Sequence, residues 1–340
     1  MKASRVLDGR SDFVIEDVPD PNPSANCVVV RVEAAFMPTY IGQLLDGVFP
    51  VTPRRPFTTG HCAVGIVEAA GEGVGDNLVG RRVYCDMYLE SPGVGVPRDY
   101  GFIGCFGVGP DAQRLLDRWP DGTFAEQVLL PRECVVPIPA QIDTEPAVLC
   151  RLGWLGTAYA GLERGGLEPG ARVAIGGASG LLGTSAVLVA LAMGAGEVAV
   201  FGRRQAVIDD LTRLDPRVTV GDWQREHDLF LECSGGPDTG RTEALVGQLR
   251  RGGAAVLVGQ LEAPLSIDAA QVMSADIAVR GSFWFPRDVP QRLLRLAASG
   301  ALDLSCFDAE VFPLDAINRA LERSLAAPGG RHHVAVACNG

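Results

Sequence analysis

Three glycines between two apolar runs carry the clearest chemical signal in this chain. Residues 173–204 read VAIGGASGLLGTSAVLVALAMGAGEVAVFGRR, so that an apolar run, a glycine-rich turn, a small-residue segment and a second apolar run follow in order. Gly177 permits a tight turn, Gly180 lets the backbone approach a phosphate, and Gly183 lets a helix lie close on a sheet. The free N–H groups at the start of such a helix attract anions. The stretch, including Ser179, therefore predicts a βαβ unit that binds the pyrophosphate of a dinucleotide.

The second apolar run ends in two arginines. Gly202, Arg203 and Arg204 stand where a site for NAD has an Asp or Glu that binds the ribose hydroxyls. A guanidinium group pairs with phosphate in a planar, bidentate way, whereas a carboxylate would repel it. We therefore predict that these residues bind the ribose 2′-phosphate and that NADPH is preferred to NADH. The alternative is that both arginines only solvate a loop.

Length and composition favour a globular protein that acts on small molecules. The chain has 340 residues, of which 47% are hydrophobic and 21% charged, enough for two domains. Its formal net charge of −11 argues against non-specific binding to nucleic acid or to an anionic membrane surface. We expect a small-molecule substrate and neither of those partners.

The sequence gives no sign of secretion or membrane insertion. Charges are scattered through the first twenty residues, unlike a secretory signal. The most apolar stretch, residues 181–201, is interrupted by Glu197, so we expect a buried helix and strand and not a membrane span. Nine cysteines, an odd number without regular spacing, indicate a reducing compartment, and we expect the cytoplasm.

The rhythm of the chain predicts two kinds of domain. Up to about residue 140, short β-like runs alternate with Gly- and Pro-rich connections, which is typical of a β-rich domain. From about residue 146, strands and helices alternate, which predicts an α/β fold with a doubly wound parallel sheet. Helices are expected from Gln205, around residues 241–250 and over residues 289–299, and a last strand in HHVAVAC. Residues 89–121 form a long loop-rich insertion, which we interpret as a substrate-side loop.

Five motifs follow one another along the chain: GHCAVGIVEAAGEGV, DGTFAEQVLLP, the glycine loop, DLFLECSGG and VRGSFWF. Together, and in this order, they resemble the medium-chain dehydrogenase/reductase superfamily, which includes zinc alcohol dehydrogenases and zinc-free quinone and enoyl reductases. The resemblance implies a GroES-like, β-rich catalytic domain in residues 1–147 and 287–340, a Rossmann domain in residues 148–286, and a substrate cleft between them. It also implies a homodimer or homotetramer, often joined through the edge strand near residues 278–285.

The resemblance also shows where this chain departs from the zinc enzymes. Those enzymes hold the catalytic metal with an early Cys, the His of a GHE motif and a later Cys. Here Pro38 stands at the early Cys, His61 is retained, Cys62 replaces the Glu, and Cys150 stands at or near the later Cys. Proline has no donor, so we predict a site without metal. The alternative is an unusual zinc site formed by His61, Cys62 and Cys150, although neighbouring strand residues point to opposite faces.

The structural zinc lobe of the family is also expected to be missing. Where relatives have four closely spaced cysteines, this chain has only Cys85 and Cys105. We interpret these two as small apolar residues of the core or a loop. His227, His332 and His333 show no partner pattern and are expected at the surface or in loops.

Without a metal, side chains must neutralise the charge that hydride transfer leaves on the acceptor. Tyr40 falls where the zinc enzymes keep a proton-relaying Ser or Thr and is the first candidate; His61 is the second and Thr39 a weaker one. The resemblance further implies that the cofactor is contacted at positions in four later segments, namely Thr157, Ser234, Gly259 and Ser282.

These expectations converge on an NADPH-dependent, zinc-independent reductase of an activated C=C, C=O or C=N bond. Reduction of C=C comes first because a conjugated acceptor spreads the developing charge, whereas the early loop fits the alcohol dehydrogenase spacing at least as well. Two alternatives stay open, a zinc-dependent alcohol dehydrogenase with the His/Cys/Cys site and an NADPH-binding protein without catalysis.

Overall fold

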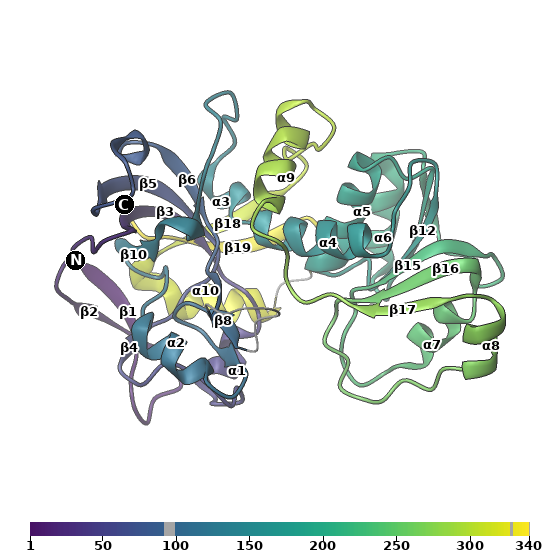
Figure 1. Ribbon diagram of the computed structural model, residues 1–340, viewed down its shortest axis with the longest axis horizontal. Coiled ribbons are helices and arrows are strands. Elements are labelled where there is room, and N and C mark those ends of the chain that lie inside the picture. Colours follow the sequence, from purple (N-terminus) through teal and green to yellow (C-terminus); the bar gives the residue numbers. More distant parts are fainter. Residues whose placement is uncertain (92–98, 327–328, 340) are drawn as a thin grey trace. The chain divides into compact units, whose positions relative to one another are not determined.

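The computed structural model describes residues 1–91, 99–326 and 329–339, and the chain forms two compact units (Figure 1). The first unit contains residues 1–152, 307–326 and 332–339, and the second contains residues 153–306 and 329–331. The chain therefore leaves the second unit twice, once after Cys306 and once after Arg331.

The first unit is built mainly from antiparallel strands. Its largest sheet has the order β11-β6-β5-β3-β19-β18, with β10 also paired to β3. The strands of this sheet are β3 (Cys27–Phe36), β5 (Ala63–Ala70), β6 (Arg82–Cys85), β10 (Gln127–Pro131), β11 (Val135–Pro137), β18 (Asp308–Pro313) and β19 (His332–Ala337). Strand β19 pairs with β3, which confirms that the chain returns to this unit at its end.

Two smaller sheets and four helices complete the described part of the first unit. One sheet has the order β2-β1-β4 and the other the order β7-β8-β9. These strands are β1 (Lys2–Val6), β2 (Phe13–Asp17), β4 (Phe57–Thr58), β7 (Tyr88–Glu90), β8 (Tyr100–Phe102) and β9 (Gly107–Val108). The helices are α1 (Ile41–Leu45), α2 (Ala112–Arg118), α3 (Pro146–Leu149) and α10 (Ile317–Ala326), with short 3-10 turns at Asp76–Leu78, Arg132–Cys134 and Leu314–Ala316.

The predicted insertion at residues 89–121 is more regular than its composition suggests. It contains the end of β7, all of β8 and β9, and α2, while residues 92–98 lie outside the described part of the chain. The hairpin pairs Tyr88 with Phe102 and Tyr100 with Val108. The insertion therefore supplies aromatic side chains on a small sheet of its own.

The second unit is a parallel sheet of six strands in the order β14-β13-β12-β15-β16-β17. The strands are β12 (Arg172–Gly176), β13 (Glu197–Phe201), β14 (Val218–Val220), β15 (His227–Glu232), β16 (Leu249–Leu257) and β17 (Ala278–Gly281). The helices are α4 (Leu152–Arg164), α5 (Leu181–Ala192), α6 (Gln205–Leu214), α7 (Gly240–Val246), α8 (Ala269–Ser274) and α9 (Val289–Ala298).

Helices cover both faces of this sheet. On one face, Gly161 of α4 and Gly165 directly after it lie so close to Leu231 and Leu229 that a Cβ atom at either glycine would collide with a leucine side chain. On the other face, Phe230 and its neighbours pack against Leu245 of α7. Side chains alternate between the two faces along each strand, so both faces must be apolar. This arrangement confirms the predicted α/β class with a doubly wound parallel sheet.

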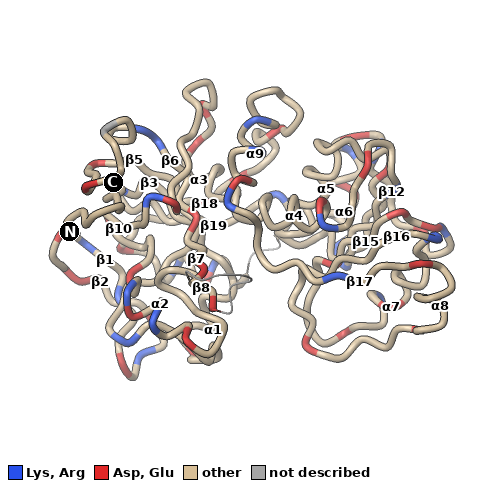
Figure 2. Tube along the Cα trace, in the orientation of Figure 1, with Lys and Arg blue, Asp and Glu red and all other residues tan. Residues whose placement is uncertain are grey.

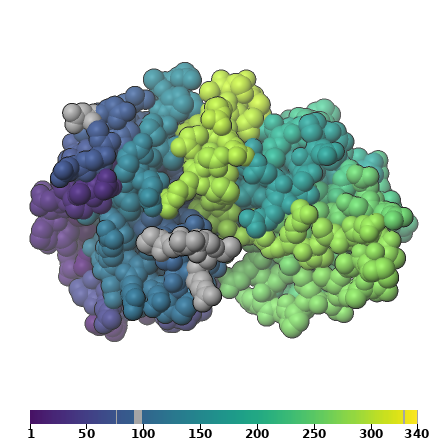
Figure 3. Space-filling model, in the orientation of Figure 1, coloured from purple at the N-terminus to yellow at the C-terminus, as the bar shows by residue number. Residues whose placement is uncertain are grey.

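The return to the first unit comes later than expected, at Phe307 and not at residue 287. Helix α9 belongs to the second unit because Arg292 pairs with Glu163 of α4 and its guanidinium lies 6.0 Å from the centre of the Tyr159 ring. In the space-filling view the residues of α9 lie against those of α4 (Figure 3). The apolar periodicity of residues 289–299 predicted the helix but not the surface against which it packs.

Two other expectations need correction. The helix expected around residues 241–250 ends at Val246, because the chain turns at Gly247 into β16, which already begins at Leu249. His227 and His333 are buried and not at the surface, with 1% and 2% of their areas exposed. His227 is the first residue of β15, and His333 is the second residue of β19. Each ring is therefore buried near the start of a strand.

Residues of both charges are scattered along the traces of both units (Figure 2). Among the described residues, none of the helices has both the length and the hydropathy needed to cross a bilayer.

Candidate active site

The glycine loop of the second unit joins β12 to α5. Gly177 has a φ of 69°, and a Cβ atom there would lie 2.6 Å from the Cα atom of Ser234. A Cβ atom at Gly183 would lie 2.2 Å from the carbonyl oxygen of Gly177. Both positions therefore require glycine, one for its φ and one for the approach of the helix to the turn.

Gly180 differs from these two glycines. It precedes α5, and a Cβ atom there would meet only the Gly177 carbonyl, at 3.3 Å. The hydroxyl of Thr184 donates to the carbonyl of Ala178 at 2.9 Å and so holds the turn. The twelve-residue helix α5 begins directly after Gly180, so the loop leads into a helix N-terminus, the kind of position that attracts a phosphate group.

The two arginines that follow β13 differ in their surroundings. Arg203 is exposed, whereas Arg204 is partly buried and its Nη2 donates to the carbonyl of Ser179. Burial and the neighbouring charge of Arg203 lower the pKa of the Arg204 guanidinium. A Cβ atom at Gly202 would lie 2.8 Å from the Ser179 hydroxyl, so the end of β13 and the glycine loop touch at this point. Arg204 thus supports the loop, whereas Arg203 is exposed and makes no ion pair with another described residue.

A buried acid organises the next strand end. Glu232 is fully buried at the end of β15, and its Oε1 accepts from the backbone N–H and the hydroxyl of Ser234 and from the N–H of Gly235. Its carbonyl accepts from the N–H of Gly259 at 2.9 Å, and a Cβ atom at Gly259 would lie 2.5 Å from its Oε2. Glu232 therefore links the loops after β15 and β16, and it accepts the hydrogen bond of the Ser234 hydroxyl. None of the sequence motifs pointed to Glu232, although an acid at the end of an apolar strand was a usable signal.

Thr157 and Ser282 also lie in the second unit. The Thr157 hydroxyl donates to the carbonyl of Gly153 within α4 at 2.8 Å, which leaves its lone pairs for other donors. Ser282 follows β17, its N–H donates to Leu257, and its buried hydroxyl has no hydrogen-bond partner among the described residues. A buried hydroxyl of this kind is costly unless it binds a ligand or water.

The candidate catalytic residues lie together in the first unit. His61 follows Gly60 on the way into β5, and its carbonyl accepts from the Thr123 hydroxyl at 2.7 Å. Tyr40 precedes α1, and its ring stands edge-on to the His61 ring, with centroids 5.7 Å apart. The fold thus brings two of the three predicted residues into contact. Thr39 is exposed beside them.

Both side chains are neutral near pH 7. Burial raises the pKa of Tyr40 well above its usual value, with smaller contributions from the thiols of Cys105 and Cys62. Burial also lowers the pKa of His61 to about 3. The Tyr40 hydroxyl makes no hydrogen bond with any residue that the structure describes. It is therefore a protonated donor that is available to a ligand, and His61 can act only as a neutral imidazole.

The thiols near His61 already have partners. The hydroxyl of Tyr84, which is fully buried, donates to Cys62 Sγ at 3.0 Å. Cys150 Sγ donates to the carbonyls of Ala34 and Pro146 at 3.1 and 3.2 Å. Burial is the main cause that raises the pKa of both thiols, which opposes the thiolate form that metals bind.

This donor set does not fit the three converging ligands of a catalytic zinc. Pro38 offers no donor, and the Cys62 and Cys150 thiols are engaged with a phenol and with backbone carbonyls. Within the described ranges, no three His, Cys, Asp or Glu side chains are grouped as metal ligands would be. Cys85 and Cys105 are both fully buried, as expected of small core residues.

Aromatic rings surround Tyr40 and His61, and sequence analysis missed most of them. We call Tyr40, Phe49, His61, Phe102 and Phe106 the ring cluster. Phe49 and Phe106 stack at 4.5 Å, and Phe102 lies 5.1 Å from both His61 and Phe106. Large aromatic residues within glycine-rich loop segments were the signal that could have revealed this cluster.

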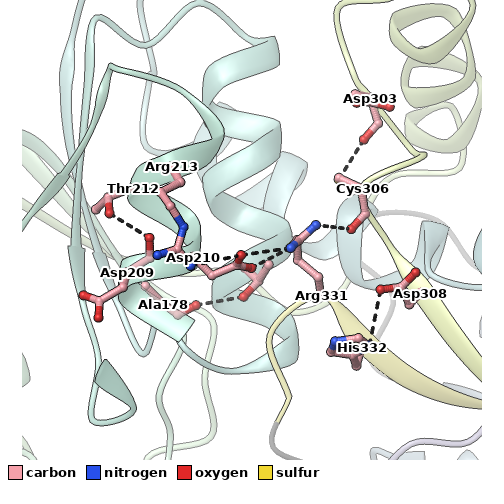
Figure 4. Close-up of polar contacts among 11 residues, drawn as sticks. Ala178, Asp209, Asp210, Thr212, Arg213, Asp303, Cys306, Asp308, Arg331 and His332 are labelled. Carbon is pink, nitrogen blue, oxygen red and sulfur yellow. Dashed lines mark hydrogen bonds and ion pairs between the residues drawn. The ribbon is translucent and has the colours of Figure 1, made fainter. Parts of the chain in front are cut away.

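Arg331 is a further residue that the sequence did not single out (Figure 4). Its Nε and Nη2 donate to the two carboxylate oxygens of Asp210 in α6, at 2.7 and 3.0 Å. Its Nη1 donates to the carbonyl of Cys306 at 3.0 Å. One guanidinium therefore joins α6 to the two positions where the chain leaves the second unit.

Known proteins share this architecture. Residues 24–140 match the alcohol dehydrogenase GroES-like domain. An alcohol dehydrogenase of Moraxella sp. is 31% identical over 338 residues, which cover 95% of each chain. An acryloyl-coenzyme A reductase of Metallosphaera sedula is 28% identical over 309 residues, with 89% of this chain and 90% of that protein covered. A Sinorhizobium meliloti protein assigned as a zinc-binding dehydrogenase, crystallised with NADP, is 26% identical with a TM-score of 0.82, covering 99% of this chain and 98% of its own.

Proposed function

Since the chain belongs to the medium-chain dehydrogenase/reductase superfamily, we propose that it is an NADPH-dependent, zinc-independent oxidoreductase that transfers hydride to an activated C=C, C=O or C=N bond of a small organic substrate. The observation that carries the proposal is the exposed Arg203 after β13, supported by Arg204, where a carboxylate would favour NADH. The NADP-bound relative and the acryloyl-coenzyme A reductases among the relatives agree with it.

The residues of the second unit suit a phosphorylated dinucleotide. Gly177, Ser179, Gly180 and Gly183 would hold the pyrophosphate at the start of α5, and Gly202 with the two arginines would hold the adenosine side. Thr157, Ser234, Gly259 and Ser282 lie in segments proposed for the nicotinamide side, and the buried Ser282 hydroxyl is the donor without a partner among the described residues. Bound NADPH supplies the hydride.

The first unit would supply the proton. When hydride adds to the acceptor carbon, negative charge develops on the conjugated carbon, oxygen or nitrogen, and NADP⁺ remains. We assign the donor role to the Tyr40 hydroxyl, because it is protonated and makes no hydrogen bond with the described residues. His61 would assist as a neutral imidazole, and Thr39 is the weaker alternative.

The two arginines are expected to contribute differently. Arg203→Ala removes only the phosphate contact, so the preference for NADPH over NADH should fall by about 10- to 100-fold, the range for a charged hydrogen bond. Arg204→Ala also frees the Ser179 carbonyl, so it should weaken both cofactors. Arg213→Ala on α6, 71% exposed, is the matched control and should change neither. Equal preference in the double variant Arg203→Ala/Arg204→Ala and the wild type would refute the NADPH assignment.

The reaction is tested with purified, tag-free protein, NADPH or NADH, and a panel of enones, quinones, aldehydes and cyclic imines. Turnover with NADPH and a zinc content far below one per chain is the expected result. One zinc per chain with inhibition by a chelator would establish instead the alcohol dehydrogenase with a His61/Cys62/Cys150 site. Tight NADPH binding without turnover would establish a non-catalytic binding protein.

Assembly and compartment are part of the same proposal. We expect a homodimer or homotetramer joined through β17, the edge strand of the parallel sheet, and a reducing, cytoplasmic environment that suits the nine free cysteines. Sedimentation of the purified protein tests the first expectation.

A further inference from the structure

We propose that the ring cluster of the first unit binds a flat, uncharged aromatic ring of the substrate, so that the enzyme prefers aryl-conjugated acceptors to alkyl ones. The reduction of those acceptors rests on the proposed function, but the binding of the ring does not. The cluster is built from three parts of the chain: Tyr40 and Phe49 on either side of α1, His61 before β5, and Phe102 and Phe106 from the insertion.

The geometry of the rings is the first argument. The Phe49 and Phe106 rings are parallel within 3°, with centroids 4.5 Å apart, and both stand nearly perpendicular to Tyr40, at 84° and 86°. Tyr40 is also perpendicular to His61, at 81°. Aromatic rings attract each other in both stacked and edge-on arrangements. The rings of the cluster therefore already pack in both arrangements, stacked and edge-on, and we propose that a substrate ring binds in one of these arrangements.

The exposure of the rings is the second argument. Phe102 and His61 are 3% exposed and form the inner part, whereas Tyr40, Phe49 and Phe106 are only partly buried. The Phe102 ring also packs against the ring of Tyr88, which lies outside the cluster, with the two centroids 5.5 Å apart. This contact supports the inner part of the cluster. The three outer rings therefore keep part of their apolar surface accessible, and Tyr40, the residue that we propose as the proton donor, is one of them.

Charge is the third argument. None of the five side chains of the cluster carries a charge near neutral pH, since Tyr40 stays protonated and His61 stays neutral. A charged group that entered among them would lose its hydration without gaining a partner of opposite charge. An aryl group conjugated to the acceptor bond loses little hydration and gains ring contacts. The cluster thus selects the neutral, flat part of a substrate.

The test separates ring binding from reduction. Titration calorimetry compares 3-phenylpropanamide with 3-cyclohexylpropanamide, which match in size and carry no reducible bond. A second measurement compares kcat/KM for cinnamaldehyde and 3-cyclohexylacrolein with NADPH. We expect the phenyl compound to be favoured at least about fivefold in both, and Phe49→Leu and Phe106→Leu to reduce that ratio to about one. Phe312→Leu, a partly exposed ring on β18 outside the cluster, should keep the full ratio.

Each outcome decides one of the two claims. Equal binding of phenyl and cyclohexyl compounds by the wild type, or a phenyl preference that survives both cluster variants, overturns the inference. A phenyl preference in calorimetry that the variants abolish, without reduction of any acceptor, supports ring binding and overturns the proposed reductase function. Reduction of both aldehydes at equal kcat/KM supports the reductase and overturns the aryl preference.

Discussion

The glycine loop of the second unit and the ring cluster of the first are two sites made in opposite ways. The loop is seven consecutive residues, 177–183, and its shape depends on backbone atoms that leave no room for a side chain at Gly177 or Gly183. The ring cluster joins side chains from positions 40 to 106, and its shape depends on their packing. We propose that the backbone-built loop serves the cofactor, which members of the family share. The side-chain-built cluster is proposed for the substrate, whose identity can then change by single substitutions.

The largest effects are expected within the loop itself. Gly183→Ala places a methyl group against the Gly177 carbonyl, so it should lower the free energy of unfolding by about 2–3 kcal/mol and weaken NADPH binding by at least about 100-fold. Gly180→Ala meets only one carbonyl, at 3.3 Å, so it should leave stability nearly unchanged and weaken NADPH binding by about tenfold. Urea unfolding and fluorescence titration measure both quantities. Equal destabilisation by the two variants would contradict a backbone-built loop.

The ring cluster should respond in catalysis and not in cofactor binding. Tyr40→Phe removes the proton donor but keeps the ring, so kcat/KM should fall about 100-fold at an unchanged dissociation constant for NADPH. Tyr88→Phe, which removes a hydroxyl that donates to Glu90 and keeps the ring, is the control and should retain activity. Steady-state kinetics together with a binding titration separates the two effects.

The pH dependence of kcat/KM tests the proposed role of Tyr40 as a proton donor. Burial raises the pKa of Tyr40 well above its usual value and lowers that of His61 to about 3, so neither group changes its charge between about pH 5 and pH 9. The ratio of kcat/KM between wild type and Tyr40→Phe should therefore stay constant over that range. A ratio that falls toward pH 9 would mean that Tyr40 loses its proton there.

We propose that the cofactor binds at the carboxyl ends of the strands of the second unit. Side chains at the opposite ends of these strands are then not needed for binding and can be replaced to raise the stability of the protein. Both ring nitrogens of the buried His227 lack hydrogen-bond partners in the described ranges, and burial lowers its pKa. His227→Leu should stabilise the protein by about 1–2 kcal/mol at pH 7. The gain should grow below about pH 6.5, because only the unfolded wild type takes up a proton there. His332→Leu, 65% exposed, is the control and should show neither gain in chemical denaturation.

The smallest effect is expected at the Asp210–Arg331 pair. The hydrogen bonds from Arg331 are the largest cause that lowers the pKa of Asp210, so the pair stabilises the fold above the unfolded pKa of about 4 and loses this effect as the pH falls through the lowered value. Asp210→Asn should cost about 0.5–1 kcal/mol at pH 7 and almost nothing near pH 3. Asp209→Asn, its exposed neighbour, should cost less at both pH values. A cost that is the same at pH 3 and pH 7 would show that the carboxylate charge is not involved.

The features that could be predicted from the sequence are the local ones, such as the glycine loop, and not the contacts between side chains that are distant in sequence. The order of strands and helices, the parallel sheet and the family are local in sequence, because periodicity and glycine spacing act over a few residues. The partners of side chains are not local. The hydrogen bond from Arg204, which stays a predicted phosphate ligand, to the Ser179 carbonyl was not predicted, and neither was the bond from the Ser234 hydroxyl to the carboxylate of Glu232. The packing of α9 on α4 also depends on residues more than a hundred positions apart, which no local pattern encodes.

The hydrogen bonds of Arg331 have one more consequence, for the two linkers that leave the second unit after Cys306 and after Arg331. Because its guanidinium donates at once to Asp210 and to the Cys306 carbonyl, both points at which the chain leaves the second unit are fastened to helix α6. A single side chain thus anchors two chain crossings, and its loss would release both at the same time.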